Sequence, residues 1–181
     1  MRLWLVRHAQ PQIAPGTCYG ALDVDADAPA TQAAAQALAR VLPQGAALHG
    51  SPLRRCAQLS QALHALRPDL QFTQDPRLRE MEFGDWEGRP WDAIDPAALQ
   101  AWTDDFAQHR PGGGESVHGF MVRVTQAWND TRAAGADAVW ITHAGVIRAA
   151  ALLYTGQVPV TRAAQWPATP CGFGTWKVLD L

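Results

Sequence analysis

The sequence lacks several features that mark secreted, membrane and metal-binding proteins. Its three cysteines are odd in number, widely spaced and without a C-x-x-C pair, which argues against a disulfide framework and a thiolate zinc site. No apolar run is long enough to cross a bilayer, and the run Leu3 to Val6 is too short for a signal peptide. We therefore expect a cytoplasmic protein with no membrane partner and no metal.

The chain also lacks an excess of charge of either sign. Its formal net charge is -2, so it has no broad basic field to attract nucleic acid or anionic lipid. Attraction for a negatively charged ligand must then come from individual arginines. The triple glycine Gly112 to Gly114 is not followed by G-K-[ST], which argues against a P-loop.

The sequence does contain enough hydrophobic residues, 48%, for a sizeable core in one domain spanning residues 1–181. Short apolar runs typical of buried strands alternate with segments typical of helices. Strands are expected within 3–6, 46–51, 69–73, 138–142 and 172–181, and helices within 30–42, 52–66, 95–109, 116–135 and 143–156. This alternation predicts a three-layer α/β/α fold with a mostly parallel central sheet.

Two of the helix starts are predicted from serine residues. Ser51, followed by Pro52, is expected to cap the helix that carries Arg54 and Arg55. Ser116, after the glycine-rich segment, is expected to cap the helix within 116–135.

Polar residues follow the two clearest strands at the point where each strand ends. Arg7 and His8 follow the first strand, and His143 follows AVWIT. In open α/β sheets, ligands bind beyond the carboxyl ends of the strands, where helix N-termini also lie. We therefore expect both histidines in one crevice, together with the start of the helix that bears Arg55.

Five blocks occur along the chain in the order LVRHAQ, SPLRRCAQ, LREMEFGDWEG, PGGGES and ITHAGVIRA. Each block alone is a weak signal, but the ordered set closely resembles the histidine phosphatase superfamily, also called phosphoglycerate mutase-like. The resemblance covers nearly the whole chain. It implies the phosphoglycerate mutase-like fold and an enzyme that hydrolyses phosphomonoesters through a phosphohistidine, with no cofactor.

The resemblance also implies which residues act on the phosphate. His8 is the implied nucleophile, and the implied phosphate ligands are Arg7, Arg55 (rather than Arg54) and His143. Glu80 is the implied proton donor to the leaving alcohol, with Glu82 as the alternative. Phosphoryl transfer needs a nucleophile, positive donors around the oxygens and a proton for the leaving oxygen, and these residue types supply each.

Contacts to the rest of the substrate are expected from the connecting loops. Tyr19 lies in the loop expected to meet the leaving group, and Gln10, Glu82 and Glu115 are further candidates. Trp86 or Trp102 is expected to line a substrate cleft. The acids from Glu80 to Glu87 also have a simpler interpretation, as a solvated acidic loop.

The compact length favours a phosphatase over a mutase, because the mutases of the superfamily typically carry added segments. The start MRLWLVRH, the loop EMEFGDWE and the segment AWTDDF resemble the α-ribazole phosphatases, which implies removal of the 5′-phosphate of α-ribazole phosphate in cobalamin biosynthesis. Ala9, Gln10-Pro11 and Ala14 depart from the usual residues of the superfamily, so the pocket beyond the phosphate is less well defined.

Other functions remain open at this point. The alternatives within the superfamily are a broad-specificity small-molecule phosphatase and a phosphoglycerate mutase-like enzyme. A non-catalytic module that binds phospholigands and a regulator that acts on phosphoproteins are alternatives of other classes. The sequence leaves the oligomeric state undecided, a homodimer included.

Overall fold

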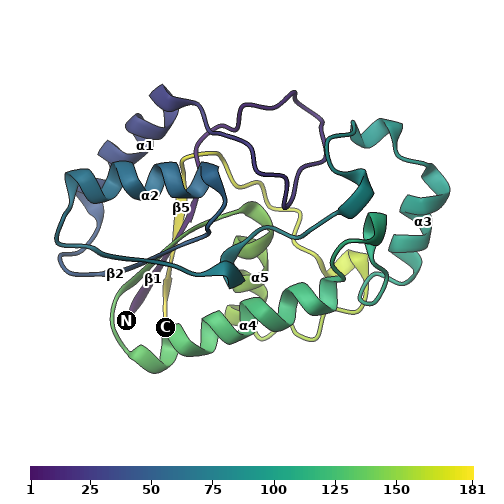
Figure 1. Ribbon diagram of the computed structural model, residues 1–181. Helices are drawn as coiled ribbons and strands as arrows, with labels where there is room; N and C mark the ends of the chain where they lie inside the picture. Colours follow the sequence, from purple (N-terminus) through teal and green to yellow (C-terminus); the bar gives the residue numbers. More distant parts are fainter.

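The computed structural model describes residues 1–181 and contains a five-stranded sheet between helices (Figure 1). The strands are β1 (Arg2–Arg7), β2 (Ala47–Gly50), β3 (Gln71–Gln74), β4 (Ala138–Thr142) and β5 (Trp176–Asp180), in the spatial order β3-β2-β4-β1-β5. Neighbouring strands from β3 to β1 pair in parallel, and β5 pairs antiparallel with β1 at the edge. The predicted mostly parallel sheet and its final edge strand are confirmed.

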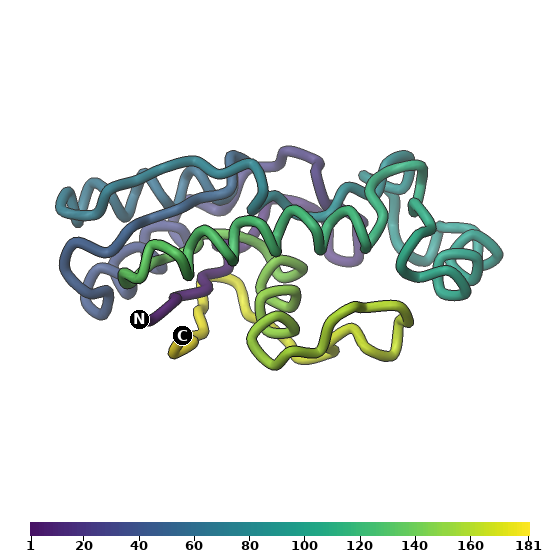
Figure 2. The backbone as a smooth tube through the Cα atoms, turned by 90° about the horizontal axis from the view of Figure 1, so that it is seen from below, coloured from purple at the N-terminus to yellow at the C-terminus, as the bar shows by residue number.

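The helices cover both faces of this sheet. They are α1 (Ala28–Val41), α2 (Arg54–Leu66), α3 (Pro96–Asp104), α4 (Val117–Ala134) and α5 (Ala144–Thr155). Helices α1 and α2 lie together over one face, and α4 and α5 lie over the other, while α3 lies at one end of the molecule (Figures 1 and 2). None of the helices is both long and apolar enough to span a membrane. The three-layer α/β/α architecture is thus as expected.

Alternate residues of the central strands belong to two different cores. Leu3 and Leu5 of β1 pack with residues of α4 and α5, whereas Trp4 and Val6 pack with residues of α1 and α2. Successive side chains of a strand point to opposite faces, so a strand covered by helices on both sides must be apolar throughout. This double burial fixes β1 and β4 at the centre of the molecule, where their carboxyl ends carry the site.

One of the two predicted helix starts is wrong. Helix α2 begins at Arg54 with Leu53 at the N-cap position and no side-chain cap, so Ser51 and Pro52 precede the helix. The Ser51 hydroxyl accepts a hydrogen bond from the Leu53 N–H at 3.3 Å and lies 2.9 Å from Nε2 of His143. The predicted Ser116 cap is confirmed, because its Oγ accepts from the Gly119 N–H at 3.1 Å.

A matched pair of substitutions in α1 tests the core between the sheet and α1/α2. The Leu38 side chain is fully buried at 0% exposure, whereas Val41, on the same helix, is 46% exposed. We expect Leu38→Ala to lower the free energy of unfolding by about 2 to 5 kcal/mol through lost burial and a residual cavity. Val41→Ala should change it by less than about 0.5 kcal/mol. Urea denaturation measures both, and equal losses would contradict this packing.

Candidate active site

The candidate site lies at the carboxyl ends of the two central strands. Arg7 of β1 is paired with Thr142 of β4 in the parallel register, so His8 and His143 follow at neighbouring positions. The His8 N–H donates to the Thr142 carbonyl at 3.0 Å, and the two imidazole centroids lie 5.2 Å apart. The structure therefore brings the two predicted histidines side by side; His8 also lines the adjoining cavity, whereas His143 is not part of its lining.

His8 is held in one orientation and in its neutral form. Its Nδ1 lies 2.7 Å from the backbone carbonyl of Ala9, so Nδ1 carries the proton and Nε2 keeps a free lone pair. Burial and the positive charge of Arg55, with a smaller effect from Arg7, lower the His8 pKa from 6.5 to about 3. A buried imidazole with a free nitrogen at neutral pH is a competent nucleophile.

Arg55 supplies a buried positive charge beside His8. Its side chain is 0% exposed, and its guanidinium donates to the carbonyls of Leu22 at 2.8 Å and Gly20 at 2.7 Å. It has no carboxylate partner, whereas the exposed neighbour Arg54 pairs with Asp25 at 2.7 Å. Backbone carbonyls satisfy N–H groups without cancelling the charge, so Arg55 remains able to bind an anion.

Arg7 is the second cation of the crevice. Its guanidinium carbon lies 3.7 Å from the centroid of the Phe173 ring, and Nη1 donates to the backbone carbonyl of Cys171. Arg7 also lacks a carboxylate partner. The segment that leads into β5 thus orients Arg7 by cation–π and carbonyl contacts and leaves its charge free.

His143 occupies the N-cap position of α5 and is 1% exposed. Its Nε2 lies 2.9 Å from Ser51 Oγ, with Cys56 Sγ 3.5 Å away. Burial, followed by the charge of Arg55, lowers the pKa of His143 well below 6.5. The contact with Ser51 holds the imidazole ring of His143 in one orientation. Because a neutral ring can donate only one hydrogen bond, this orientation decides how His143 meets a ligand.

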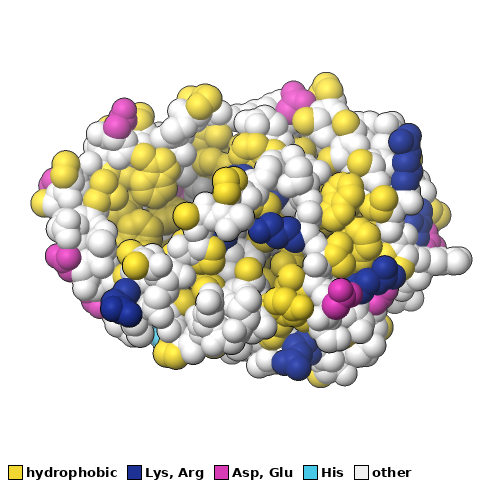
Figure 3. All heavy atoms as spheres, turned by 180° about the vertical axis from the view of Figure 1, so that it is seen from behind, with side chains coloured by type: hydrophobic (Ala, Val, Ile, Leu, Met, Phe, Trp, Pro, Cys, Tyr) yellow, Lys and Arg dark blue, Asp and Glu magenta, His cyan; other side chains and the backbone are white.

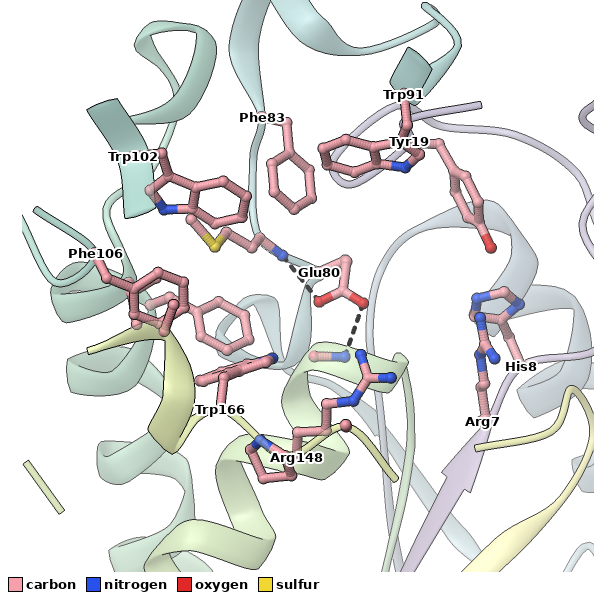
Figure 4. Close-up of a pocket in the computed structure, with 17 residues that line it drawn as sticks. Arg7, His8, Tyr19, Glu80, Phe83, Trp91, Trp102, Phe106, Arg148 and Trp166 are labelled. Atoms are coloured by element: carbon pink, nitrogen blue, oxygen red, sulfur yellow. Dashed lines mark hydrogen bonds between the residues drawn. The ribbon is translucent and has the colours of Figure 1, made fainter. Parts of the chain in front are cut away.

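Glu80 faces the same cavity from the loop after β3 (Figure 4). Its carboxylate accepts hydrogen bonds from the N–H groups of Gly145 at 3.0 Å and Met81 at 3.1 Å. A Cβ on Gly145 would lie 2.1 Å from Glu80 Oε1, so only glycine permits this approach at the start of α5. Glu82, the predicted alternative, is exposed and does not line the cavity.

Two other candidate residues lie outside the cavity. Gln10 is exposed, and Glu115 forms an ion pair with Arg123 at 2.7 Å. Arg123 also donates to the carbonyls of Arg77 at 2.6 Å and Glu80 at 3.1 Å. Sequence reasoning missed Arg123, which ties the Glu80 loop to α4 with Glu115 as its partner.

The whole cavity has a volume of about 520 Å³, and beyond Glu80 its walls are largely aromatic. Tyr19 and Trp102 line it as expected, together with Phe83, Trp91, Phe106, Phe120, Trp166 and Arg148. Trp86 instead packs behind this wall, 5.9 Å from Trp102 between ring centroids. Figure 3 shows the hollow and the hydrophobic side chains around it at the end of the molecule that carries α3. Its lining comes from connecting loops together with residues of α3, α4 and α5.

A buried neutral histidine close to two guanidinium groups without carboxylate partners is suited to an anionic group such as phosphate. The profile of the histidine phosphatase superfamily (branch 1) matches residues 3–177, and the chain belongs to this superfamily. It is a phosphoric monoester hydrolase, as its phosphatase relatives also indicate.

Two relatives and one solved structure show how broad the similarity is. The chain is 35% identical to the glucosyl-3-phosphoglycerate phosphatase of Mycolicibacterium vanbaalenii, over 92% of this chain and 77% of the relative. It is 27% identical to the adenosylcobalamin/alpha-ribazole phosphatase of Salmonella typhimurium, over 100% and 91%. The native structure of a mycobacterial glucosyl-3-phosphoglycerate phosphatase superposes with a TM-score of 0.81 at 29% identity, covering 99% of this chain and 89% of the other.

The lowered His8 pKa predicts a loss of stability in acid. In the unfolded chain His8 takes up a proton below its ordinary pKa of 6.5, whereas the folded protein resists this until about 3. Unfolding therefore binds protons in this window, and stability falls as the pH falls through it. From about pH 7 to about pH 5, His8 should contribute a loss of about 2 kcal/mol.

His8→Asn is the matched variant, because its side-chain amide can still donate to the Ala9 carbonyl but does not titrate. Urea denaturation at the two pH values should show a smaller acid loss for His8→Asn than for the wild type. Identical losses in both proteins would mean that His8 is not held neutral by the fold.

Proposed function

We propose that the protein hydrolyses small-molecule phosphomonoesters through a phosphohistidine formed on His8. The observation that carries the proposal is the neutral His8 imidazole, buried between Arg7 and Arg55, neither of which has a carboxylate partner. An anionic phosphate placed there would be attracted to both guanidinium groups. Burial, together with these cations, keeps the nucleophile unprotonated.

In the first half-reaction, Nε2 of His8 attacks phosphorus and the bond to the leaving oxygen breaks. The charge that spreads over the phosphoryl oxygens is stabilised by Arg7, Arg55 and His143. Glu80 gives its proton to the leaving oxygen. The Ala9 carbonyl stabilises the positive charge that develops on the imidazole, because it accepts the Nδ1 proton.

In the second half-reaction, water attacks the phosphohistidine and Glu80 accepts the proton of that water. The His8–phosphorus bond breaks, inorganic phosphate is released and neutral His8 is restored. One carboxyl serves both steps because the second proton transfer reverses the first. The backbone N–H groups of Met81 and Gly145 hold Glu80 in place throughout.

Substitutions of the nucleophile and the acid test this mechanism. His8→Ala should lower kcat at least about a thousandfold. It should also abolish the acid-labile phosphoenzyme that rapid quenching of the wild type is expected to trap. Glu80→Gln should lower kcat by about a hundredfold or more, with a smaller effect on phosphate binding. Glu82→Gln, two residues away and outside the cavity, is the matched control. A loss in Glu82→Gln as large as that in Glu80→Gln would reassign the acid.

For the substrate, we propose a phosphomonoester whose alcohol carries a flat apolar group, with α-ribazole 5′-phosphate as the leading candidate. The support is the aromatic wall beyond Glu80, formed by Trp102, Phe106 and Trp166 among others, because such walls stack on flat rings. The similarity to the alpha-ribazole phosphatases agrees with this choice. The benzimidazole of α-ribazole would occupy the aromatic part of the cavity.

A second candidate is glucosyl-3-phosphoglycerate, the compound named in the 35% identical relative. The observation in its favour is Arg148, a cation in the cavity wall that could meet the glycerate carboxylate. The apolar walls are less suited to a glucosyl group, whose hydroxyls would lose hydrogen bonds to water there.

A panel of phosphomonoesters separates these substrates. We expect kcat/KM for α-ribazole 5′-phosphate to exceed that for glucosyl-3-phosphoglycerate and 3-phosphoglycerate at least about tenfold, because stacking on the walls is lost with the latter two. The reverse order would establish the second candidate. Absence of turnover with every member and with a generic aryl phosphate would instead indicate a phospholigand-binding module.

A further inference from the structure

Arg148 differs from the other buried or half-buried arginines of the protein, because its side chain has no partner. Its side chain extends from α5 into the cavity, beside Glu80 and Trp166 (Figure 4). It forms no hydrogen bond or ion pair with any other residue, and its Nε is buried with no acceptor.

The other buried or half-buried arginines show why the lack of a partner at Arg148 is unusual. Arg67, Arg77 and Arg123 each pair with at least one carboxylate. Arg7, Arg55 and Arg148 have none. Arg7 and Arg148 line the cavity, and the charge of Arg55 acts on His8, which also lines it. Taking a cation out of water without an acceptor costs free energy. Arg7 and Arg55 have a ligand in the proposed function, the phosphate, so Arg148 is also expected to have one.

The position of Arg148 indicates which part of the substrate it meets. In Figure 4, His8 and Arg7 lie on one side of Glu80, and the aromatic wall with Trp102, Phe106 and Trp166 lies on the other. Glu80 protonates the leaving oxygen in the proposed function, so the leaving group extends from Glu80 toward that wall. The Arg148 guanidinium stands beside Glu80 at this boundary, and most of the surrounding lining is hydrophobic.

We propose that Arg148 is a specificity-determining residue that binds a hydrogen-bond acceptor on the leaving group. This inference rests on the proposed function and adds to it the kind of alcohol that the enzyme selects: a flat apolar body with one acceptor at its edge. The planar guanidinium can donate to a neutral ring nitrogen or, more strongly, to a carboxylate. A ring nitrogen would be supplied by a benzimidazole nucleoside, and a carboxylate by a phosphoglycerate.

Three aryl phosphates of similar size test the inference: naphthyl phosphate, which has no acceptor, quinolinyl phosphate, which has a ring nitrogen, and carboxynaphthyl phosphate. The latter two are used as sets of positional isomers. In the wild type, kcat/KM for the best isomer of at least one set should exceed that for naphthyl phosphate about tenfold or more. Whichever set is favoured identifies the source of the acceptor.

Arg148→Met should reduce this preference to within about twofold, mainly by raising KM for the preferred isomer. Arg148→Lys keeps the charge and N–H donors but not their planar arrangement, so it should retain only part of the preference for either acceptor. Arg132→Met removes an exposed arginine of α4 that lies outside the cavity. It should keep the full preference.

Three results would overturn the inference. One is a wild type that hydrolyses all three aryl phosphates without preference. Another is an Arg148→Met variant whose kcat/KM falls by the same factor for all three, which would place Arg148 on the phosphate instead. The third is an Arg148→Met variant that keeps the wild-type preference. No hydrolysis of any probe by the wild type would overturn the proposed function itself, which is a different outcome from these three.

Discussion

The parallel pairing of β1 with β4 is the constraint on which the site depends. Its register sets Arg7 opposite Thr142, so the next residue of each strand is a histidine, and the His8 N–H completes the ladder on the Thr142 carbonyl. β2 extends the same arrangement, because the Ser51 N–H donates to the Ile141 carbonyl at 2.9 Å. Three segments distant in sequence therefore place their polar residues at the carboxyl ends of adjacent strands.

The electrostatics of the crevice follow from what its arginines bind. Arg7 and Arg55 donate to backbone carbonyls and not to carboxylates, so their orientation is fixed while their charge stays uncompensated. That charge and burial together keep His8 neutral. A phosphate that arrives would provide the missing negative charge without any reorganisation of the donors, which is the condition for strong electrostatic stabilisation of phosphoryl transfer.

The sequence was sufficient to predict the central strands, the final strand and the proximity of His8, His143 and Arg55. Apolar runs that end in polar residues carry that information, since burial on both faces leaves little choice of residue. Ser51 was misassigned because a serine followed by a proline usually marks the start of a helix. Here α2 starts at Arg54, three residues after Ser51. Of the cavity lining, Tyr19 and Trp102 were predicted. Arg148 and the other aromatic residues were not, because the packing of loops against α3, α4 and α5 brings them together.

This division between predictable and unpredictable parts has a physical basis. The residues around His8 project from the ends of strands and helices, whose positions the sheet determines. The cavity beyond Glu80 is built from loops, α3, the start of α4, Arg148 of α5 and the segment around Trp166. Its loops can change without disturbing the sheet. Recognition of the leaving group can thus differ between proteins that share the chemistry. In such a largely apolar cavity a single guanidinium has a large effect on selectivity, because a substrate that leaves it without an acceptor bears the whole cost of that burial.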